Sequence, residues 1–238
     1  LAEIINNHKK IALYCGYGAK DAVKEVELLA EKLNATIAYS FRGKIFFDKP
    51  ESQYTVGMNG LLGNPSGFKS LEKADVVLML GTDFPYAEFM PKDNLIVQID
   101  KRAEIIGSRA KVDYGYQGDI KDTLEVLLPF LNVKNDKKYE KPKEDAIENK
   151  LNPEDAAVLI NKYASDDAIF TVDTGMTCVW AARLIKASKN RYLTGSFNHG
   201  SMANALPMAI GAAASDKNKQ VIAMCGDGGL SMLLGDLA

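Results

Sequence analysis

Hydrophobic and polar positions follow two alternating patterns along the first 131 residues. Short apolar runs such as 11–15 and 76–80 have strand length, and between them apolar residues return every three or four positions, which is helical spacing. Alternation of this kind predicts a parallel sheet with helices on its faces. The expected elements are strands at 11–15, 36–39, 76–80 and 95–99, helices at 22–33 (N-capped by Asp21) and 120–131, and turn-rich loops at 57–67 and 82–91.

The pattern breaks at residues 132–152, where Lys and Glu dominate and apolar periodicity is lost. We interpret this segment as a linker between a domain at 1–131 and a second α/β region at 153–238. The expected elements of that region are helices at 154–163, 177–187 and 203–214, strands at 168–172 and 221–225, and a helix start at Ser231. The predicted fold class is therefore α/β, with a parallel-sheet domain followed by part of another.

Composition and charge disfavour several classes of protein. The 238 residues suffice for one to two domains, and a net charge of -2 lacks the positive field that nucleic-acid binding needs. Hydrophobic residues make up 47%, yet no apolar run approaches the roughly 20 residues that span a bilayer. The cysteines, Cys15, Cys178 and Cys225, form no disulfide framework and indicate buried thiols from a reducing compartment. A start at Leu1 and an end within an expected helix indicate a piece of a longer chain.

A glycine turn, Gly16-Tyr17-Gly18, follows the first strand and could admit a phosphate to a helix N-terminus. The full dinucleotide fingerprint fails, because Asp21 stands at its third glycine position and no acidic residue ends the second strand. An ordinary NAD-binding enzyme is therefore disfavoured, and a purely structural turn stays open.

Two other strand ends carry polar groups. Asp100 follows the strand at 95–99, where open α/β sheets bind ligands, and its carboxylate could accept hydrogen bonds from a ribose or cap its own turn. The segment 81–86 follows the strand at 76–80 and adds backbone donors and an aromatic surface. Together these ends predict a nucleotide-sized crevice at one edge of the sheet.

The second region holds a sharper motif, Gly226-Asp227-Gly228-Gly229, directly after an apolar strand. Asp227 offers hard oxygen ligands to Mg²⁺, and the glycines would let a diphosphate approach the backbone, although a plain turn is the alternative. About 25 residues upstream, the segment 198–202 precedes another helix. Two glycine-punctuated helix starts suit a cofactor with two ends.

These residues together resemble the thiamine-diphosphate-dependent enzymes of the pyruvate oxidase and acetolactate synthase superfamily. The run 195–207 (GSFNHGSMANALP), the motif 223–229 (AMCGDGG) and the pair DTG at 173–175 and VWAAR at 179–183 look most like the quinone-reducing pyruvate oxidases, also called pyruvate dehydrogenase (quinone). The resemblance covers nearly the whole chain.

The resemblance implies thiamine diphosphate and Mg²⁺ as cofactors of the second region. It places metal binding on Asp227 and diphosphate contacts on Gly228 and Gly229. It places the aminopyrimidine contacts on Gly200, Ser201 and Met202. The family's second metal ligand, an Asn some 25 to 30 residues further on, and its activating Glu, which a preceding domain supplies, have no counterpart in this chain, which ends 11 residues after Asp227.

The resemblance also implies FAD in the first domain. The matching residues are Asn59, Gly60, Leu61, Leu62, Thr82, Asp83, Phe84, Pro85, Tyr86 and Asp100. Relatives often carry Thr at the position of Asn59 and Gln at that of Asp83. A carboxylate would be unfavourable beside a flavin diphosphate, so we expect Asp83 to make contact through its backbone.

The implied activity is oxidative decarboxylation of pyruvate to acetate and CO₂, with electrons passing through FAD to a membrane quinone. The implied setting is a homo-oligomer in the cytoplasm, peripheral to the inner face of the membrane, and this piece alone would be inactive. The enzymatic alternatives are a phosphate- and oxygen-using pyruvate oxidase that makes acetyl phosphate and an acetolactate synthase. A non-catalytic FAD-binding assembly module is the alternative from another class. No catalytic residue is assigned, and His199 could be an acid or base or merely structural.

Overall fold

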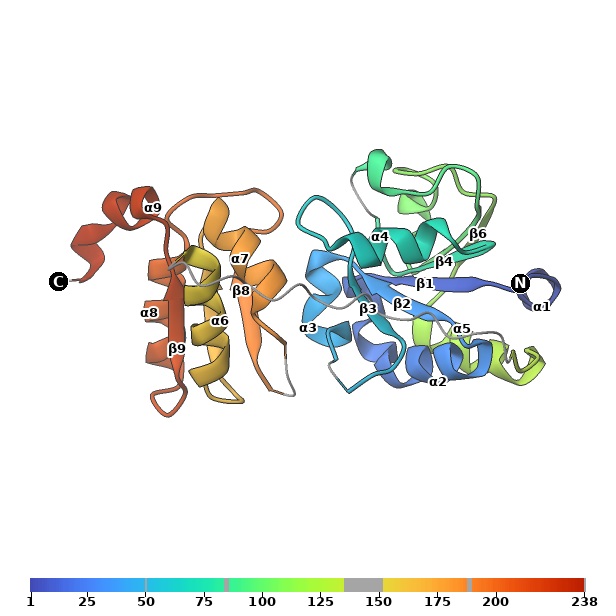
Figure 1. The fold of residues 1–238 in the computed structure, drawn as a ribbon, viewed down its shortest axis with the longest axis horizontal. Helices are drawn as coiled ribbons and strands as arrows, with labels where there is room; N and C mark the ends of the chain where they lie inside the picture. The colour runs from blue at the N-terminus through green and yellow to red at the C-terminus, as the bar shows by residue number, and fades with distance from the viewer. Residues whose placement is uncertain (50, 84–85, 135–151, 188–189, 238) are drawn as a thin grey trace. The chain divides into compact units, whose positions relative to one another are not determined.

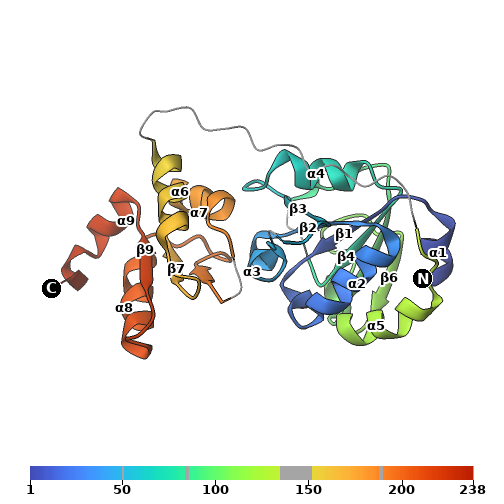
Figure 2. The same cartoon turned by 60° about the horizontal axis from the view of Figure 1, so that its bottom comes forward.

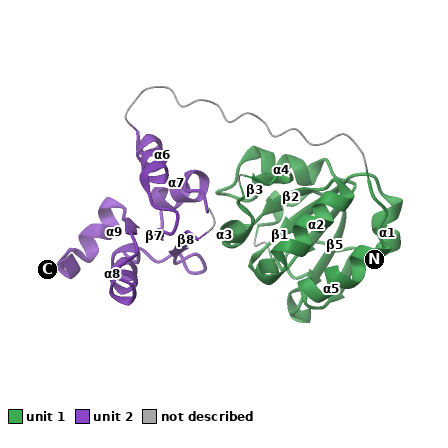
Figure 3. Cartoon of the chain, turned by 90° about the horizontal axis from the view of Figure 1, so that it is seen from below, with its two compact units in different colours: residues 1–144 green, residues 145–238 purple. Residues whose placement is uncertain are grey.

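The computed structural model of the chain describes residues 1–49, 51–83, 86–134, 152–187 and 190–237. These form two compact units, residues 1–144 and residues 145–238 (Figure 3). The predicted linker lies almost wholly outside the described residues, so its boundaries stay a prediction. Among the described helices, none combines the length and apolarity needed to cross a membrane.

Unit 1 alternates strands and helices in the predicted manner (Figure 1). Its strands are β1 (Ile11–Cys15), β2 (Thr36–Tyr39), β3 (Thr55–Met58), β4 (Val76–Leu80), β5 (Leu95–Asp100) and β6 (Tyr114–Gln117). Its α-helices are α1 (Ala2–Asn7), α2 (Val23–Leu33), α3 (Lys44–Phe47), α4 (Pro65–Glu72) and α5 (Ile120–Leu127). Short 3₁₀ helices lie at η1 (Tyr17–Ala22), η2 (Phe41–Gly43), η3 (Ala87–Phe89), η4 (Ala103–Ile105) and η5 (Leu128–Phe130).

The six strands form one sheet in the order β3-β2-β1-β4-β5-β6, and every neighbouring pair is parallel. The chain builds outward from β1 to β3 and then returns to add β4 on the other side of β1. The carboxyl ends of β1 and β4 therefore form the topological switch point, where doubly wound sheets bind ligands. Helices α2 and α5 contact each other on one face, and α4 covers β1, β2 and β3 on the other (Figure 2).

The core lies on both faces of this sheet. All five residues of β1 and all five of β4 are buried, as expected for parallel strands covered on both faces. On the α4 face, Leu71 packs with Tyr14 and Met79, which alternate with residues facing the other layer. This packing fixes the strand ends from which the candidate site is built.

The sequence pattern did not predict five described elements of unit 1, namely α1, α3, β3, α4 and β6. The segment read as turns at 57–67 contains the end of β3 and the start of α4, and β6 was not expected. Asp21 does not cap α2, because the chain enters that helix through η1 and the N-cap position is Ala22. The helix expected at 120–131 ends at Leu127 and continues as the short η5, whose second residue is Pro129.

Unit 2 has a three-stranded parallel sheet in the order β8-β7-β9. Its elements are α6 (Pro153–Tyr163), β7 (Ile169–Val172), α7 (Met176–Leu184), β8 (Tyr192–Gly195), α8 (Ala205–Ser215), β9 (Val221–Met224), α9 (Asp227–Met232) and the 3₁₀ helix η6 (Leu234–Leu237). Helix α6 packs on α7, and α8 packs on β7 and β9. Asn152 starts α6 with a capping box to Asp155.

The α/β fold class with parallel sheets is confirmed in both units. In unit 2 the strand β8 was not expected. The helix predicted to begin at Ser231 in fact begins at Asp227, with Gly226 at its N-cap. Asp227 therefore stands in the first helical turn rather than in a loop ahead of it.

Candidate functional site

The glycine turn after β1 packs directly against the turn after β4. The Gly18 N–H donates to the Gly81 carbonyl at 2.9 Å, and Gly81 has a φ of +59°. A Cβ on Gly81 would lie 2.5 Å from the Gly18 carbonyl carbon, so no side chain fits there. The turn Gly16-Tyr17-Gly18 thus has a structural role, one of the two alternatives that the sequence allowed. Its backbone packs against the turn after β4 at the switch point.

The predicted residue Asn59 links two loops at the same edge. Its side chain is buried, its Nδ2 donates to the Phe89 carbonyl at 2.9 Å, and its Oδ1 accepts from the Gly60 N–H at 2.9 Å. Leu61 is exposed in the loop that follows, and Leu62 is half-buried. The loop after β3 is thereby tied to η3 in the segment beyond β4.

A second buried amide, which the sequence did not single out, holds the segment after β4. Gln98 of β5 donates from Nε2 to the Thr82 carbonyl at 3.1 Å and accepts at Oε1 from the Gly107 N–H at 2.8 Å. Thr82 is buried, whereas Tyr86 is exposed with its ring edge-on to Phe89. The predicted residues Phe84 and Pro85 lie outside the described residues.

Asp100 is buried at the end of β5, and its Oδ1 accepts from the Arg102 N–H at 2.9 Å. This is the turn-capping contact that the sequence left open beside a ribose contact. The Arg102 guanidinium lies 4.0 Å from the Asp83 carboxylate, with both side chains exposed. Asp83 thus has a cation beside it, although an exposed pair of this kind adds little stability.

Positive charge also gathers at this edge, around Tyr17 and the loop after β2. Arg42 lies 4.6 Å and Lys20 5.1 Å from the Tyr17 ring centroid, and Phe46 meets the ring edge-on at 5.7 Å. Tyr17 and Arg42 are 25 positions apart in the sequence, so no local motif predicted their contact. An anionic ligand at this edge would meet two cations despite the negative net charge of the chain.

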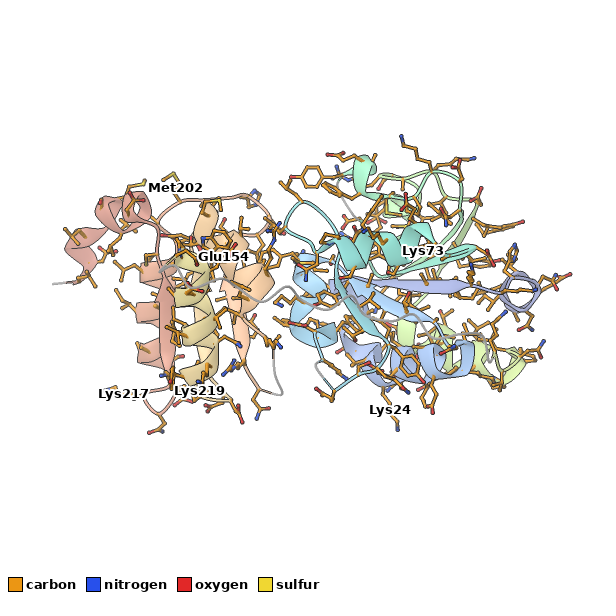
Figure 4. The ribbon with its side chains drawn as sticks, in the orientation of Figure 1. Lys24, Lys73, Glu154, Met202, Lys217 and Lys219 are labelled. Carbon is orange, nitrogen blue, oxygen red and sulfur yellow. The ribbon has the colours of Figure 1, made fainter. Side chains whose placement is uncertain are left out.

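In unit 2 the structure brings the two predicted turns together. A Cβ on Gly228 would lie 3.6 Å from the Met202 methyl carbon, and one on Gly229 would lie 3.2 Å from the Ala203 nitrogen. Figure 4 shows Met202 close to α9. Met202 therefore lies beside the turn at 227–229.

A carboxylate that the sequence did not assign joins these turns. Asp173, at the end of β7, is 1% exposed; its Oδ1 accepts from the Ala205 N–H at 2.9 Å and its Oδ2 from the Gly226 N–H at 3.3 Å. The start of α8 is thus already occupied by a protein carboxylate. The expectation that both helix starts suit one cofactor stays a prediction.

Asp227 fits a role as a metal ligand. The residue is exposed, and its carboxylate has no hydrogen bond or ion pair with any residue that the structure describes. No three His, Cys, Asp or Glu side chains in the described part of the chain come together as a metal cluster. A cation here would therefore need oxygen ligands beyond this carboxylate, such as those of a diphosphate. His199 is exposed in the neighbouring loop.

The three free thiols differ in burial. Cys15 is buried as expected, whereas Cys178 and Cys225 are half-buried. Burial raises the pKa of the Cys15 thiol well above its ordinary value and that of Cys178 to about 11. For Cys225, burial and then the Asp173 carboxylate raise the pKa. Few of these thiols are therefore ionised near neutral pH.

Two family models match the chain, and each matched segment includes one of the two candidate sites. Residues 1–127 match the thiamine pyrophosphate enzyme central domain, and residues 173–238 match the C-terminal thiamine pyrophosphate binding domain of the same enzymes. The first match covers the strand ends of unit 1, and the second covers Asp173 and both turns of unit 2.

Several curated relatives align along most of the chain. The Bacillus subtilis protein YdaP, provisionally named as thiamine pyrophosphate-containing, is 32% identical over 99% of the chain and 43% of its own length. Pyruvate oxidase of Lactiplantibacillus plantarum is 30% identical over 95% of the chain and 40% of its own. Acetolactate synthase isozyme 1 large subunit of Escherichia coli is 31% identical over 100% and 45%. The chain thus spans less than half the length of these relatives.

Proposed function

Because this chain belongs to the thiamine pyrophosphate enzyme family, we propose that it forms part of an enzyme that decarboxylates pyruvate oxidatively to acetate and CO₂, passing the electrons through FAD to a membrane quinone. The observation that carries the proposal is the single surface formed by Met202 and the turn at 227–229, with the Asp227 carboxylate open beside it. The quinone as acceptor rests on the resemblance carried by residues 195–207 and 223–229.

In unit 2, Asp227 would bind Mg²⁺, and Gly228 and Gly229 would contact the diphosphate. Gly200, Ser201 and Met202 would contact the aminopyrimidine side of thiamine diphosphate. When bound, thiamine diphosphate supplies the carbanion chemistry of the decarboxylation, and FAD supplies the electron acceptor. The contribution of the chain is to hold the metal and to fix the two turns against each other.

In unit 1, the proposed flavin nucleotide site is the carboxyl edge of the sheet. Asn59–Leu62, Thr82, Asp83 and Tyr86 would line it, with Asp100 near the ribose. The side chain of Asn59 donates to the Phe89 carbonyl and that of Gln98 to the Thr82 carbonyl, and these hydrogen bonds fix the loops. Lys20 and Arg42 would offset phosphate charge at the same edge.

A phosphate-using pyruvate oxidase that makes acetyl phosphate is the second candidate, favoured by the pyruvate oxidase relative. An acetolactate synthase is a third, favoured by a relative of nearly equal identity. All of these use pyruvate, and we propose pyruvate as substrate and a homo-oligomer as the working form. We also propose a cytoplasmic location, peripheral to the inner face of the membrane.

The test uses the longer protein that carries this chain. Pyruvate-dependent reduction of a soluble quinone analogue, without phosphate and without oxygen consumption, is the expected result. A strict requirement for phosphate with formation of acetyl phosphate would favour the second candidate. Acetolactate formation without net oxidation would favour the third, and absence of a flavin absorption band after addition of FAD would contradict the flavoprotein proposal.

The metal assignment has its own test in the same protein. Asp227→Ala should weaken the binding of Mg²⁺ and thiamine diphosphate by about tenfold or more, because it removes the proposed ligand. Asp236→Ala is the matched control, since Asp236 is an exposed carboxylate in the neighbouring 3₁₀ helix η6. Unchanged affinity in Asp227→Ala would overturn the assignment.

A further inference from the structure

A buried carboxylate joins three parts of unit 2 that are far apart in the sequence. Asp173 ends β7, and its two oxygens accept from the first N–H of α8, at Ala205, and from the Gly226 N–H ahead of α9. These donors lie 32 and 53 positions away. We propose that Asp173 is a positioning residue, which holds the turn of Asp227 and the turn of Met202 in one fixed arrangement.

The coupling reaches the Met202 turn through Asn204. Its Nδ2 donates to the Ser201 carbonyl at 2.7 Å and approaches Asp173 Oδ1 at 3.5 Å, while its Oδ1 accepts from the Ser196 N–H at 3.2 Å. Asn204 therefore ties both ends of the loop 196–204 to the position of the carboxylate. A shift of the Asp173 side chain would therefore displace Ser201 as well as Gly226.

Size and charge both restrict this position to an aspartate. A Cβ on Gly229 would lie 2.2 Å from Asp173 Oδ2, so α9 approaches the carboxylate as closely as a glycine permits. A longer Glu side chain at 173 would collide with this turn. An Asn would place an N–H₂ group opposite one of the two N–H donors, leaving a buried donor without an acceptor.

The inference rests on the proposed function in one respect. The turn at 227–229 would hold the metal and diphosphate, and the turn at 200–202 the aminopyrimidine side, so their separation must match one cofactor. Asp173 would contact neither end of that cofactor, and it acts by fixing the two protein segments that do. Its loss should therefore lower affinity while the sheet stays folded.

The experiment compares Asp173→Asn, Asn204→Ala and the control Asp216→Asn in the full chain. Asp216 is also an aspartate of unit 2 that accepts a backbone N–H, from Asn218 at 3.0 Å, but in an exposed turn. Amide hydrogen exchange is measured over residues 196–204, 226–232 and the strands β7 and β9. Titration with thiamine diphosphate and Mg²⁺ gives the affinity, and fluorescence of the single tryptophan, Trp180 in α7, reports the folding of unit 2.

Asp173→Asn should raise exchange about tenfold or more in both turns, leave β7 and β9 within about twofold, and weaken cofactor affinity about tenfold or more. Asp216→Asn should change neither readout. Unchanged exchange in either turn, or unchanged affinity with both turns loosened, would overturn the proposal. So would a uniform rise across the strands, which indicates a merely structural role.

Asn204→Ala keeps the test decisive if Asp173→Asn does not fold. It removes the link to Ser201 but leaves the buried carboxylate with its two backbone donors, so exchange should rise at 196–204; no rise there would overturn the proposal. If the unsubstituted chain itself binds no thiamine diphosphate with Mg²⁺, the titration is repeated in the longer protein used to test the proposed function, and failure to bind there would overturn that function. The exchange pattern then still decides whether Asp173 couples the two turns.

Discussion

The two candidate sites are held together in different ways. At the carboxyl edge of unit 1, the turns after β1 and β4 meet backbone to backbone through Gly16, Gly18 and Gly81. In unit 2, the turns are linked by side chains, the buried carboxylate of Asp173 and the amide of Asn204. A backbone contact fails when any side chain is added, whereas a side-chain tether can be removed while leaving the surrounding space intact. Substitutions at the two sites separate these cases.

The largest effect is expected for Gly81→Ala. The new Cβ would lie 2.5 Å from the Gly18 carbonyl carbon, and the φ of +59° adds strain, so unit 1 should lose about 3 kcal/mol or more. Urea unfolding followed by far-ultraviolet circular dichroism measures the change. Gly107→Ala is the matched control, with a φ of +74° and no atom within 4 Å, and should cost only about 1 kcal/mol. Equal losses in both variants would contradict backbone closure at Gly81.

Thiol reactivity should also distinguish the two units. Cys15, sealed in β1 with a raised pKa, should react at least about a hundredfold more slowly than Cys225 with a thiol reagent. The pKa of Cys178 is raised from 9.0 to about 11, so its protonated form is favoured and its rate should keep rising up to about pH 11 instead of levelling near pH 9. Mass spectrometry of timed reactions measures each site. Rapid labelling of Cys15 in the folded chain would contradict its burial in β1.

Gly229→Ala is expected to destabilise unit 2 by about 2 kcal/mol, because the new Cβ would press on Asp173 Oδ2. Gly211→Ala in α8 is the control, since no atom lies within 4 Å, and helix propensity should stabilise it by up to about 1 kcal/mol. Tryptophan fluorescence during urea unfolding follows both. If Gly229→Ala left the stability of unit 2 unchanged, α9 would be able to move away from the carboxylate.

The smallest effect concerns backbone strain beside the tether. Ala203 has a φ of 58°, in the left-handed region that favours glycine. Ala203→Gly should therefore stabilise unit 2 by about 0.5 to 1 kcal/mol. The comparison is Asn34→Gly at the C-cap of α2, where φ is 47° and asparagine is already tolerated, so little change is expected. Calorimetric melting temperatures measure both, and a destabilised Ala203→Gly would show that the loop gains more from restricted freedom than it loses to strain.

Burial patterns explain how much of the fold could be predicted. The central strands β1, β4 and β5 are nearly continuous apolar runs, so the sequence identified them. The strands β3, β6 and β8 carry Gly or Tyr at sheet edges or exposed positions, and their pairing, rather than their composition, makes them strands. Asp21 illustrates the limit for helices, because the chain enters α2 through a 3₁₀ helix that no local signal indicated.

The candidate site was predictable where one motif carried the chemistry. Asp227 and the segment 200–202 were singled out in this way, and the structure places Met202 beside Gly228, the residue after Asp227. Asp173 and Gln98 were missed because each joins backbone groups of other segments, up to 53 positions away in the case of Asp173. Only the folded sheet, which gathers strand ends at one edge, shows such contacts.

The proposed flavin nucleotide site at the carboxyl edge of unit 1 can be tested by titration of FAD fluorescence with the chain, comparing Asp100→Ala with Asp113→Ala. Asp113 accepts the Ile96 N–H at 2.8 Å at the opposite edge of the same sheet, just as Asp100 accepts the Arg102 N–H at its own edge. We predict saturable quenching with one FAD per chain, weakened about tenfold by Asp100→Ala and within about twofold of the unsubstituted chain in Asp113→Ala. Absence of saturable quenching, or equal weakening by both substitutions, would contradict the proposed site.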